Sequence, residues 1–327
     1  MSSSKGMVSL EFVPSIAEWR SDQVESAVTV GMFDGLHLGH QALVGQLTTG
    51  AIERGLRSVV VTFDRHPKEI LAGSRGPGVI TILREKQELL DQAHVGMCAL
   101  IPGHCNILHL DAEEFVREYL VTRLRARLVV VGYDFRFGRG RTGDFALLQV
   151  LGRTYGYTVT QATPVFVGER PVKSTWIRNC IQAGEMADAA RLLGRPYTLS
   201  GPVQTGAQIG RQLGFPTANV GYSPEKLLPA LGVYGGYAVA EGRRQLCAIN
   251  IGVRPTIDSD GGEAATLVEA HLIGFDGDLY GKNVTLELFS NLRKEQRFSS
   301  LEALRTQIWR DVEEIQRQAP TWGTPQR

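Results

Sequence analysis

The sequence lacks the features that mark secreted, disulfide-linked and membrane proteins. Its four cysteines stand at positions 98, 105, 180 and 247 without a CxxC pair, which excludes a disulfide scaffold or a zinc knuckle. No apolar run approaches the ~18 residues of a transmembrane helix, and residues 1–12 contain no apolar signal-peptide core. We therefore predict a cytoplasmic protein without a membrane partner.

The chain also lacks an excess of charge of either sign. Its 35 Lys and Arg residues against 34 Asp and Glu residues leave a formal charge of +1, which argues against a nucleic-acid partner. Hydrophobic residues form 43% of the chain, as in folded proteins, and 327 residues suffice for about two domains. Glycine is in excess, with 37 residues, and glycine serves tight turns and close backbone approaches.

The N-terminal half alternates short apolar segments with helical ones. Continuous apolar, β-branched runs, which predict strands, occur at 27–30, 59–62, 128–131 and 157–160. Helical patterns occur at 41–54, 85–93 and 112–124. Strands that are apolar throughout and separated by helices predict a parallel sheet covered on both faces, as in an α/β Rossmann-like domain. Ligands of such sheets gather at the carboxyl ends of the strands.

The C-terminal half has short segments punctuated by glycine and proline. Strands are predicted at 232–240, 246–251, 267–273 and 284–289, a pattern typical of an antiparallel sheet or small barrel. A capping box at 299–302 opens an amphipathic helix whose apolar residues recur from Leu301 to Ile315. We expect this terminal helix to pack against the barrel.

The boundary between the two halves is predicted near residue 194. A helix at 185–193 ends at Gly194, a residue suited to the position after a helix, and Pro196 follows. This pattern predicts one domain over 8–194 and a second over 195–320.

The segment GMFDGLHLGH, residues 31–40, follows a predicted strand and opens a predicted helix. His37 and His40 are three residues apart, so both rings can face one spot at the start of that helix, where backbone N–H groups favour phosphate. Two imidazoles can donate hydrogen bonds to a phosphoryl group as negative charge develops on it. The alternative is a strand–helix turn with two structural histidines.

The HxGH string resembles the hallmark of a nucleotidyltransferase superfamily, whose members attack the α-phosphate of ATP and release pyrophosphate. Its second hallmark, S-T-x-x-R, matches residues 174–178. The resemblance implies catalytic roles for His37 and His40. It implies nucleotide-binding roles for Gly31, Phe33, Asp34, Gly39, Ser174, Thr175 and Arg178.

Two more segments follow predicted strands and so belong to the same edge of the sheet. They are TFDRHP at 62–67 and the aromatic and basic glycine-rich segment 131–144. A nucleic-acid interface is one interpretation of the second segment, but the near-zero net charge favours a flat phosphorylated small molecule. As flavin-binding candidates we take Asp64, His66, Asp134, Phe135 and Arg136.

The C-terminal half opens with four glycines in the segment 201–219, which ends in FPTAN. Thr217 and Asn219 are two residues apart, so in an extended segment they face the same side. Both carry hard oxygen ligands of the kind that Mg²⁺ takes beside nucleotide phosphates. A polar turn is the alternative.

The string GRQLGFPTAN resembles the hallmark of riboflavin kinases, and GVYG at 232–235 and VEAH at 268–271 match the same family. The resemblance implies that Thr217 and Asn219 hold Mg²⁺ and that Glu269 is the general base. Strand alternation puts Val268 and Ala270 on one face and leaves Glu269 on the other. The remaining implied residues are Gly206, Gly210 and Arg211 for the nucleotide and Arg293 for the flavin.

With both motif sets, the chain resembles the bacterial bifunctional riboflavin kinase/FMN adenylyltransferase family, also called FAD synthetases. The resemblance implies that the barrel phosphorylates riboflavin to FMN and that the N-terminal domain adenylylates FMN to FAD. ATP, riboflavin, FMN and FAD would be the small-molecule partners and Mg²⁺ the cofactor. The alternatives are that only one activity is retained, or that the chain is a non-catalytic flavin-binding module. The sequence leaves a homo-oligomer open.

Two residues depart from the family pattern near the adenylyl-transfer motifs. Lys173 stands where a second serine is usual before S-T-x-x-R, and Arg65 interrupts the usual T-F-D-P-H-P. Both add positive charge near a polyphosphate site, so they leave the efficiency of adenylyl transfer open.

Overall fold

The computed structural model describes residues 9–19, 23–65, 78–206, 210, 213–253 and 266–322. The chain forms two compact units, Met1–Ser174 and Thr175–Arg327. Among the described residues, no helix combines the length and apolar character needed to cross a membrane. His66 and Arg211, two of the predicted site residues, lie outside the described residues.

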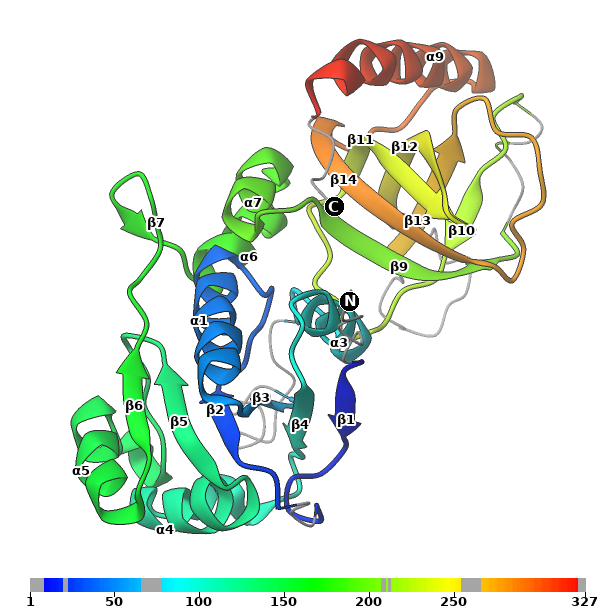
Figure 1. The fold of residues 1–327 in the computed structure, drawn as a ribbon. Coiled ribbons are helices and arrows are strands. Elements are labelled where there is room, and N and C mark those ends of the chain that lie inside the picture. The colour runs from blue at the N-terminus through cyan, green and yellow to red at the C-terminus, as the bar shows by residue number, and fades with distance from the viewer. Residues whose placement is uncertain are drawn as a thin grey trace, which may run out of the picture. The chain divides into compact units, whose positions relative to one another are not determined.

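The first unit is built on a parallel sheet of six strands in the order β1-β4-β3-β2-β5-β6 (Figure 1). The strands are β1 (Glu11–Val13), β2 (Ser26–Val30), β3 (Arg57–Phe63), β4 (Met97–Ile101), β5 (Ala126–Val131) and β6 (Thr158–Gln161). The predicted parallel sheet is confirmed. Sequence analysis found β2, β3, β5 and β6 but missed β1 and β4.

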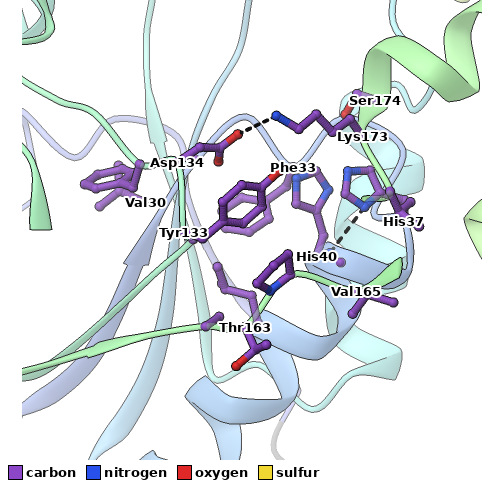
Figure 2. Close-up of a pocket in the computed structure, with 18 residues that line it drawn as sticks. Val30, Phe33, His37, His40, Tyr133, Asp134, Thr163, Val165, Lys173 and Ser174 are labelled. Carbon is purple, nitrogen blue, oxygen red and sulfur yellow. Dashed lines mark hydrogen bonds and ion pairs between the residues drawn. The ribbon is translucent and has the colours of Figure 1, made fainter. Parts of the chain in front are cut away.

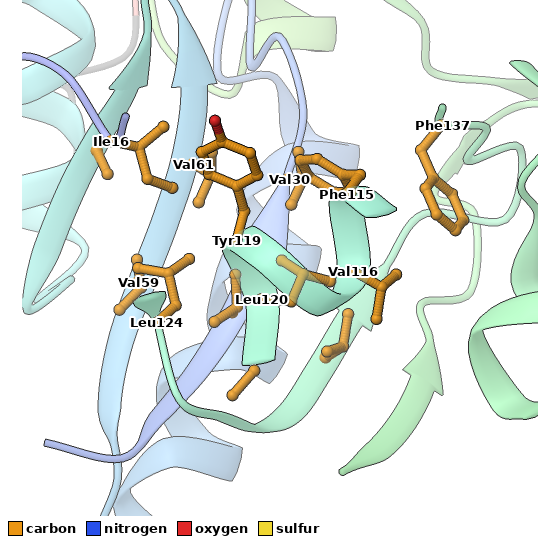
Figure 3. Close-up of a cluster of buried hydrophobic side chains, with 14 of the residues drawn as sticks. Ile16, Val30, Val59, Val61, Phe115, Val116, Tyr119, Leu120, Leu124 and Phe137 are labelled. Carbon is orange, nitrogen blue, oxygen red and sulfur yellow. The ribbon is translucent and has the colours of Figure 1, made fainter. Parts of the chain in front are cut away.

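Helices cover both faces of this sheet. They are α1 (Leu38–Arg54), α3 (Leu83–Gln92), α4 (Ala112–Phe115), which the π-helix η2 (Val116–Arg123) continues, and α5 (Phe145–Tyr155). Along β3 the side chains alternate, so Val60 packs with α1 and α3 while Val59 and Val61 pack with α4 and η2 (Figure 3). Because both faces of β3 are covered, the three consecutive residues 59–61 are all valine.

The strand order creates an opening at one edge of the sheet. From β2 the chain crosses through α1 to β3 on one side, while β5 pairs with β2 on the other side. The loops that leave the carboxyl ends of β2 and β5 therefore diverge. In open α/β sheets this is where ligands bind.

The second unit contains a closed antiparallel barrel in the order β10-β13-β12-β11-β14-β9. Its strands are β9 (Tyr197–Gln204), β10 (Ala218–Val220), β11 (Gly232–Ala240), β12 (Arg243–Val253), β13 (Thr266–Leu272) and β14 (Asn283–Arg293). The predicted barrel is confirmed, and its interior receives alternate residues of β13, with Val268 and Ala270 almost fully buried.

Two helices precede the barrel, α6 (Ser174–Ala183) and α7 (Met186–Leu193). Gly194 caps α7 in the left-handed conformation, with φ of 72°, as the sequence predicted. Helix α7 lies against β9 and β14 of the barrel, and the two compact units meet between residues 174 and 175. The domain bounds 8–194 and 195–320 stay a prediction.

The terminal helix α9 (Leu301–Gln318) packs on the barrel at β12 and β11, as expected. Ser300 is its N-cap and accepts a hydrogen bond from the Ala303 backbone N–H. An ion pair ties the helix to β14, since the Arg293 guanidinium donates to both Asp311 carboxylate oxygens at 2.9–3.1 Å. The Asp311 side chain is only 7% exposed and that of Arg293 19%.

We expect Asp311→Asn to lower the free energy of unfolding of the barrel by at least about 2 kcal/mol. The substitution leaves the half-buried Arg293 guanidinium without its carboxylate, and breaking a fully buried pair costs ~3–5 kcal/mol. Urea unfolding followed by tryptophan fluorescence would measure the loss. The control is Glu314→Gln, which breaks the exposed Glu314–Arg317 pair on the same helix and should leave stability nearly unchanged. Equal effects of the two substitutions would contradict the role given to Asp311.

Candidate functional site

Two cavities lie at the carboxyl edge of the parallel sheet. The first, of about 250 Å³, is lined by the turn after β2, the first turn of α1, the loop after β5 and the segment before α6 (Figure 2). The second, of about 550 Å³, lies toward the ends of β3 and β4. Val30, Gly31, Asp134 and Phe135 line both. Of the predicted residues, the first cavity collects Gly31, Phe33, His37, Gly39, His40, Asp134, Phe135 and Ser174.

The two histidines meet in the first cavity. His37 is the N-cap of α1, and its Nδ1 accepts a hydrogen bond from the His40 backbone N–H at 3.4 Å. The two rings stack with centroids 3.7 Å apart, and the ring of Phe33 meets that of His40 edge-on at 5.2 Å (Figure 2). Since Nδ1 of His37 accepts this bond, the proton of the neutral tautomer is assigned to Nε2.

Two glycines make room for these rings. A Cβ on Gly39 would lie 3.2 Å from the His37 ring, and a Cβ on Gly31 would lie 3.2 Å from the Phe33 ring. Such contacts are tighter than side chains normally accept. Glycine in the HxGH motif therefore lets the ring of the first histidine keep its position, which a Cβ would push by a few tenths of an ångström.

Asp34 fixes the turn rather than lining the cavity. Its Oδ1 accepts hydrogen bonds from the backbone N–H groups of Ile80 and Thr81 at 2.8 and 3.2 Å, and its side chain is almost fully buried. Its carbonyl oxygen accepts a hydrogen bond from Ser174 Oγ at 2.9 Å. These contacts join the segment before α3 and the start of α6 to the turn. The nucleotide-binding role of Asp34 stays a prediction.

The electrostatic setting keeps His40 neutral. Burial lowers its pKa well below the usual value of 6.5, and the nearby His37 and Lys86 lower it further. Its Nδ1 is buried and has no hydrogen-bond partner among the described residues. His40 lines the first cavity, and a buried polar atom without a partner beside a cavity is a place where a ligand can bond.

Lys86 is a site-forming residue that sequence reasoning missed. It is 4% exposed on α3, and its ammonium donates to the Met32 carbonyl at 2.8 Å and to Thr62 Oγ1 at 3.1 Å. Burial lowers its pKa, while Asp34 opposes that shift. Lys86 thereby joins the ends of β2 and β3 and places positive charge under the turn. The available signal was helical spacing, because Lys86 stands four residues before the buried Leu90.

The second cavity is mainly apolar and aromatic. Phe63, Ile101 and Phe115 line it, and Phe135 stacks on Phe137 with centroids 5.5 Å apart. Such walls suit a flat ring system. Arg136 also lines this cavity and forms an ion pair with Asp144 at 2.7 Å.

Other predicted residues are not brought into these cavities. Asp64 is exposed just after β3 and is not among the lining residues. Thr175 and Arg178 continue helix α6 beyond Ser174 and belong to the second unit. Their phosphate-binding roles stay predictions.

In the barrel, a third cavity of about 580 Å³ is lined by Thr217, with Asp276 and Asp278 across it. The two predicted glycines lie against the two predicted metal ligands. A Cβ on Gly206 would overlap the Asn219 amide, and one on Gly210 would come within 3.2 Å of Thr217 Oγ1. Gly206 and Gly210 therefore lie directly against Asn219 and Thr217, respectively.

Glu269 stands opposite two asparagines across the sheet. It pairs with Asn219 on β10 and with Asn250 on β12, and all three are half-buried. Directly opposed residues share a face of a sheet, so these three form a polar row on the outside of the barrel. Asn250 was not among the predicted site residues.

Two aromatic contacts and one hydrogen bond hold the FPT segment in place. Phe215 meets the rings of His271 and Trp309 edge-on at 5.2 Å each, and His271 Nδ1 lies 2.9 Å from the Pro216 carbonyl oxygen. Arg293, predicted to bind flavin, has its guanidinium on Asp311 instead. Its flavin-binding role stays a prediction.

Comparisons with known proteins point to one family across both units. A family model described as FAD synthetase matches residues 19–176, and one described as riboflavin kinase matches residues 193–319. The bifunctional riboflavin kinase/FMN adenylyltransferase of Escherichia coli K12 is 37% identical over 293 residues, covering 89% of this chain and 92% of that protein. The protein of the same name from Pseudomonas fluorescens is 38% identical over 303 residues, covering 93% and 96%.

The fold as a whole also has a solved counterpart. A crystal structure of a Streptococcus pneumoniae protein named a macrolide-efflux protein matches with a TM-score of 0.83 at 27% identity, covering 94% of this chain and 98% of that one. That name describes the pneumococcal protein, and the likeness to this chain is one of fold and sequence.

We expect His40 to stay neutral at pH 6 in the folded protein. Its folded pKa lies below the 6.5 of an ordinary histidine, so below pH 6.5 the unfolded chain binds a proton that the folded chain does not. The stabilisation is therefore complete above pH 6.5 and is lost as the pH falls. NMR titration of labelled histidines checks this directly, with His40→Asn to assign the signal. A His40 resonance that titrates at or above pH 6.5 would contradict the prediction.

Proposed function

Because this chain belongs to the family of bifunctional riboflavin kinase/FMN adenylyltransferases, we propose that each unit carries one step of FAD synthesis. The barrel unit phosphorylates riboflavin with ATP to give FMN. The α/β unit transfers AMP from a second ATP to FMN, giving FAD and pyrophosphate. The observation that carries the second assignment is the stacked pair His37 and His40 at the start of α1, in a cavity that adjoins an aromatic one.

In the adenylyl transfer, the first cavity takes ATP and the second takes the flavin ring. An oxygen of the FMN phosphate forms a bond to the α-phosphorus, and the bond from that phosphorus to the bridging oxygen breaks, so that pyrophosphate leaves. His37 and His40 donate hydrogen bonds to the oxygens that gain charge in this step. Gly31, Phe33, Gly39 and Ser174 line the nucleotide cavity. The sequence resemblance assigns further phosphate-binding roles to Thr175 and Arg178 of α6.

The flavin ring packs against the aromatic walls of the second cavity. Asp134, Phe135 and Arg136 stand at the junction of the two cavities or within the second, so they lie where the FMN phosphate approaches ATP. Asp64 follows β3 at the same edge of the sheet, and the sequence resemblance assigns a flavin-binding role to Asp64 and to His66. In this proposal the acceptor phosphate lies beside the histidine pair.

In the kinase step, Glu269 takes the proton of the ribityl 5′-hydroxyl, and that oxygen attacks the γ-phosphorus of ATP. Gly206, Gly210 and Arg211 form the phosphate cradle. Thr217 Oγ1 and the Asn219 amide oxygen fit Mg²⁺, because they are hard oxygen donors and because Gly206 and Gly210, which lie against them, carry no side chain. Bound there with ATP, Mg²⁺ would neutralise phosphate charge. Phosphoryl transfer needs mainly positioning and such charge neutralisation.

The two steps can be separated by a pair of substitutions. We expect Glu269→Gln to lower FMN formation from riboflavin by ~10²–10⁴-fold, because it removes the general base, while FAD formation from supplied FMN persists. His40→Asn should do the reverse. Chromatographic assays that start once from riboflavin and once from FMN measure both steps. A variant that loses both activities, or one that loses neither, would contradict the assignment of one activity to each unit.

We expect Gly206→Ala to reduce the kinase rate by about 10²-fold through displacement of Asn219, since ~1 Å errors in positioning carry costs of this size. FAD formation from FMN should not change. Gly45→Ala on α1 is the matched control, because a Cβ there meets no atom within 4 Å. A Gly206→Ala protein with wild-type kinase activity would remove the argument for close approach of the loop.

A further inference from the structure

We propose that Lys173 is a phosphate-binding residue of the adenylyl-transfer site. Its ammonium pairs with Asp134 when no nucleotide is bound and with the polyphosphate when ATP binds. The inference rests on the proposed adenylyl transfer in the α/β unit. It assigns a role to a residue that departs from the family pattern, which has serine at this position.

Lys173 spans the mouth of the nucleotide cavity. Its ammonium lies 3.2 Å from Asp134 Oδ2 and 5.3 Å from the centre of the Tyr133 ring, and both partners belong to the loop after β5 (Figure 2). Lys173 itself comes from the other side, directly before Ser174 and α6. All of these residues line the cavity that contains the histidine pair.

The ion pair is of a kind that a phosphate can displace. The side chains of Lys173 and Asp134 are 50% and 61% exposed, and exposed ion pairs contribute little net stability because water competes for both charges. A polyphosphate offers several charged oxygens to the same ammonium, and charge-assisted hydrogen bonds to phosphate are the stronger ones. Tyr133 and Asp134 also raise the pKa of Lys173, so it stays fully charged at neutral pH.

The competing interpretation is a purely structural clamp, in which Lys173 only fastens the loop after β5. The two interpretations predict different effects of Asp134→Asn on nucleotide binding. Both Lys173→Met and Asp134→Asn break the ion pair. If the pair is only a clamp, both substitutions weaken the site. If Lys173 binds phosphate, removing the lysine weakens nucleotide binding, whereas removing the competing carboxylate strengthens it or leaves it unchanged.

The test measures KM for ATP in FAD formation from supplied FMN, and KM for pyrophosphate in the reverse reaction from FAD. We expect Lys173→Met to raise both by about tenfold, the equivalent of one lost charged hydrogen bond. Lys173→Arg should restore them in large part, and Asp134→Asn should lower them or leave them at the wild-type value. FMN formation from riboflavin, carried out by the other unit, serves as the internal control for folding.

Ionic strength gives a second readout, independent of how Asp134→Asn affects flavin binding. If Lys173 contacts phosphate, KM for ATP in Lys173→Met should rise less steeply with salt than in the wild type. The proposal is overturned if Lys173→Met changes neither KM by more than twofold, or if its salt dependence equals that of the wild type. A wild-type chain that makes no FAD from FMN would instead refute the proposed function.

Discussion

The α/β unit depends on the divergence of the chain on the two sides of β2. Parallel strands need crossover connections, and here one crossover leads from β2 to β3 while β5 lies on the opposite side. The backbone therefore cannot close over the carboxyl ends of β2 and β5. Every functional feature of this unit uses that opening: the first turn of α1, the loop after β5 and the two adjoining cavities.

In the proposed function the two units handle phosphate by different physical means. In the α/β unit two imidazoles lie at a helix start, and the buried ammonium of Lys86 bonds to the turn before it. In the barrel unit Gly206 and Gly210 lie against Asn219 and Thr217, with Glu269 on the neighbouring strand. This difference matches their chemistry, because adenylyl transfer builds charge on the α-phosphate whereas the kinase must also accept a proton.

A residue's place in a sequence motif did not predict which contacts its side chain makes. Asp34 and Arg293 both belong to motifs that the sequence resemblance used, yet Asp34 holds backbone N–H groups and Arg293 holds α9. Their carboxylate and guanidinium stabilise the frame around a site rather than line its cavity. Lys86 and Asn250, conversely, gain their positions through contacts with residues distant in the sequence. Lysine on a helix is usually solvated, so spacing alone gave only a weak signal for Lys86.

By itself, the sequence determined the fold class, the two families of motifs and most helix and strand positions, because these depend on local periodicity, turn residues and spacing along the chain. The capping residue Gly194 is an example, since a cap acts on the helix next to it. Only the tertiary structure decided which residues meet. The placement of glycines on Asn219 and Thr217 and the Lys173–Asp134 pair both require segments to be brought together in space. Such contacts depend on strand order and packing, which no local pattern encodes.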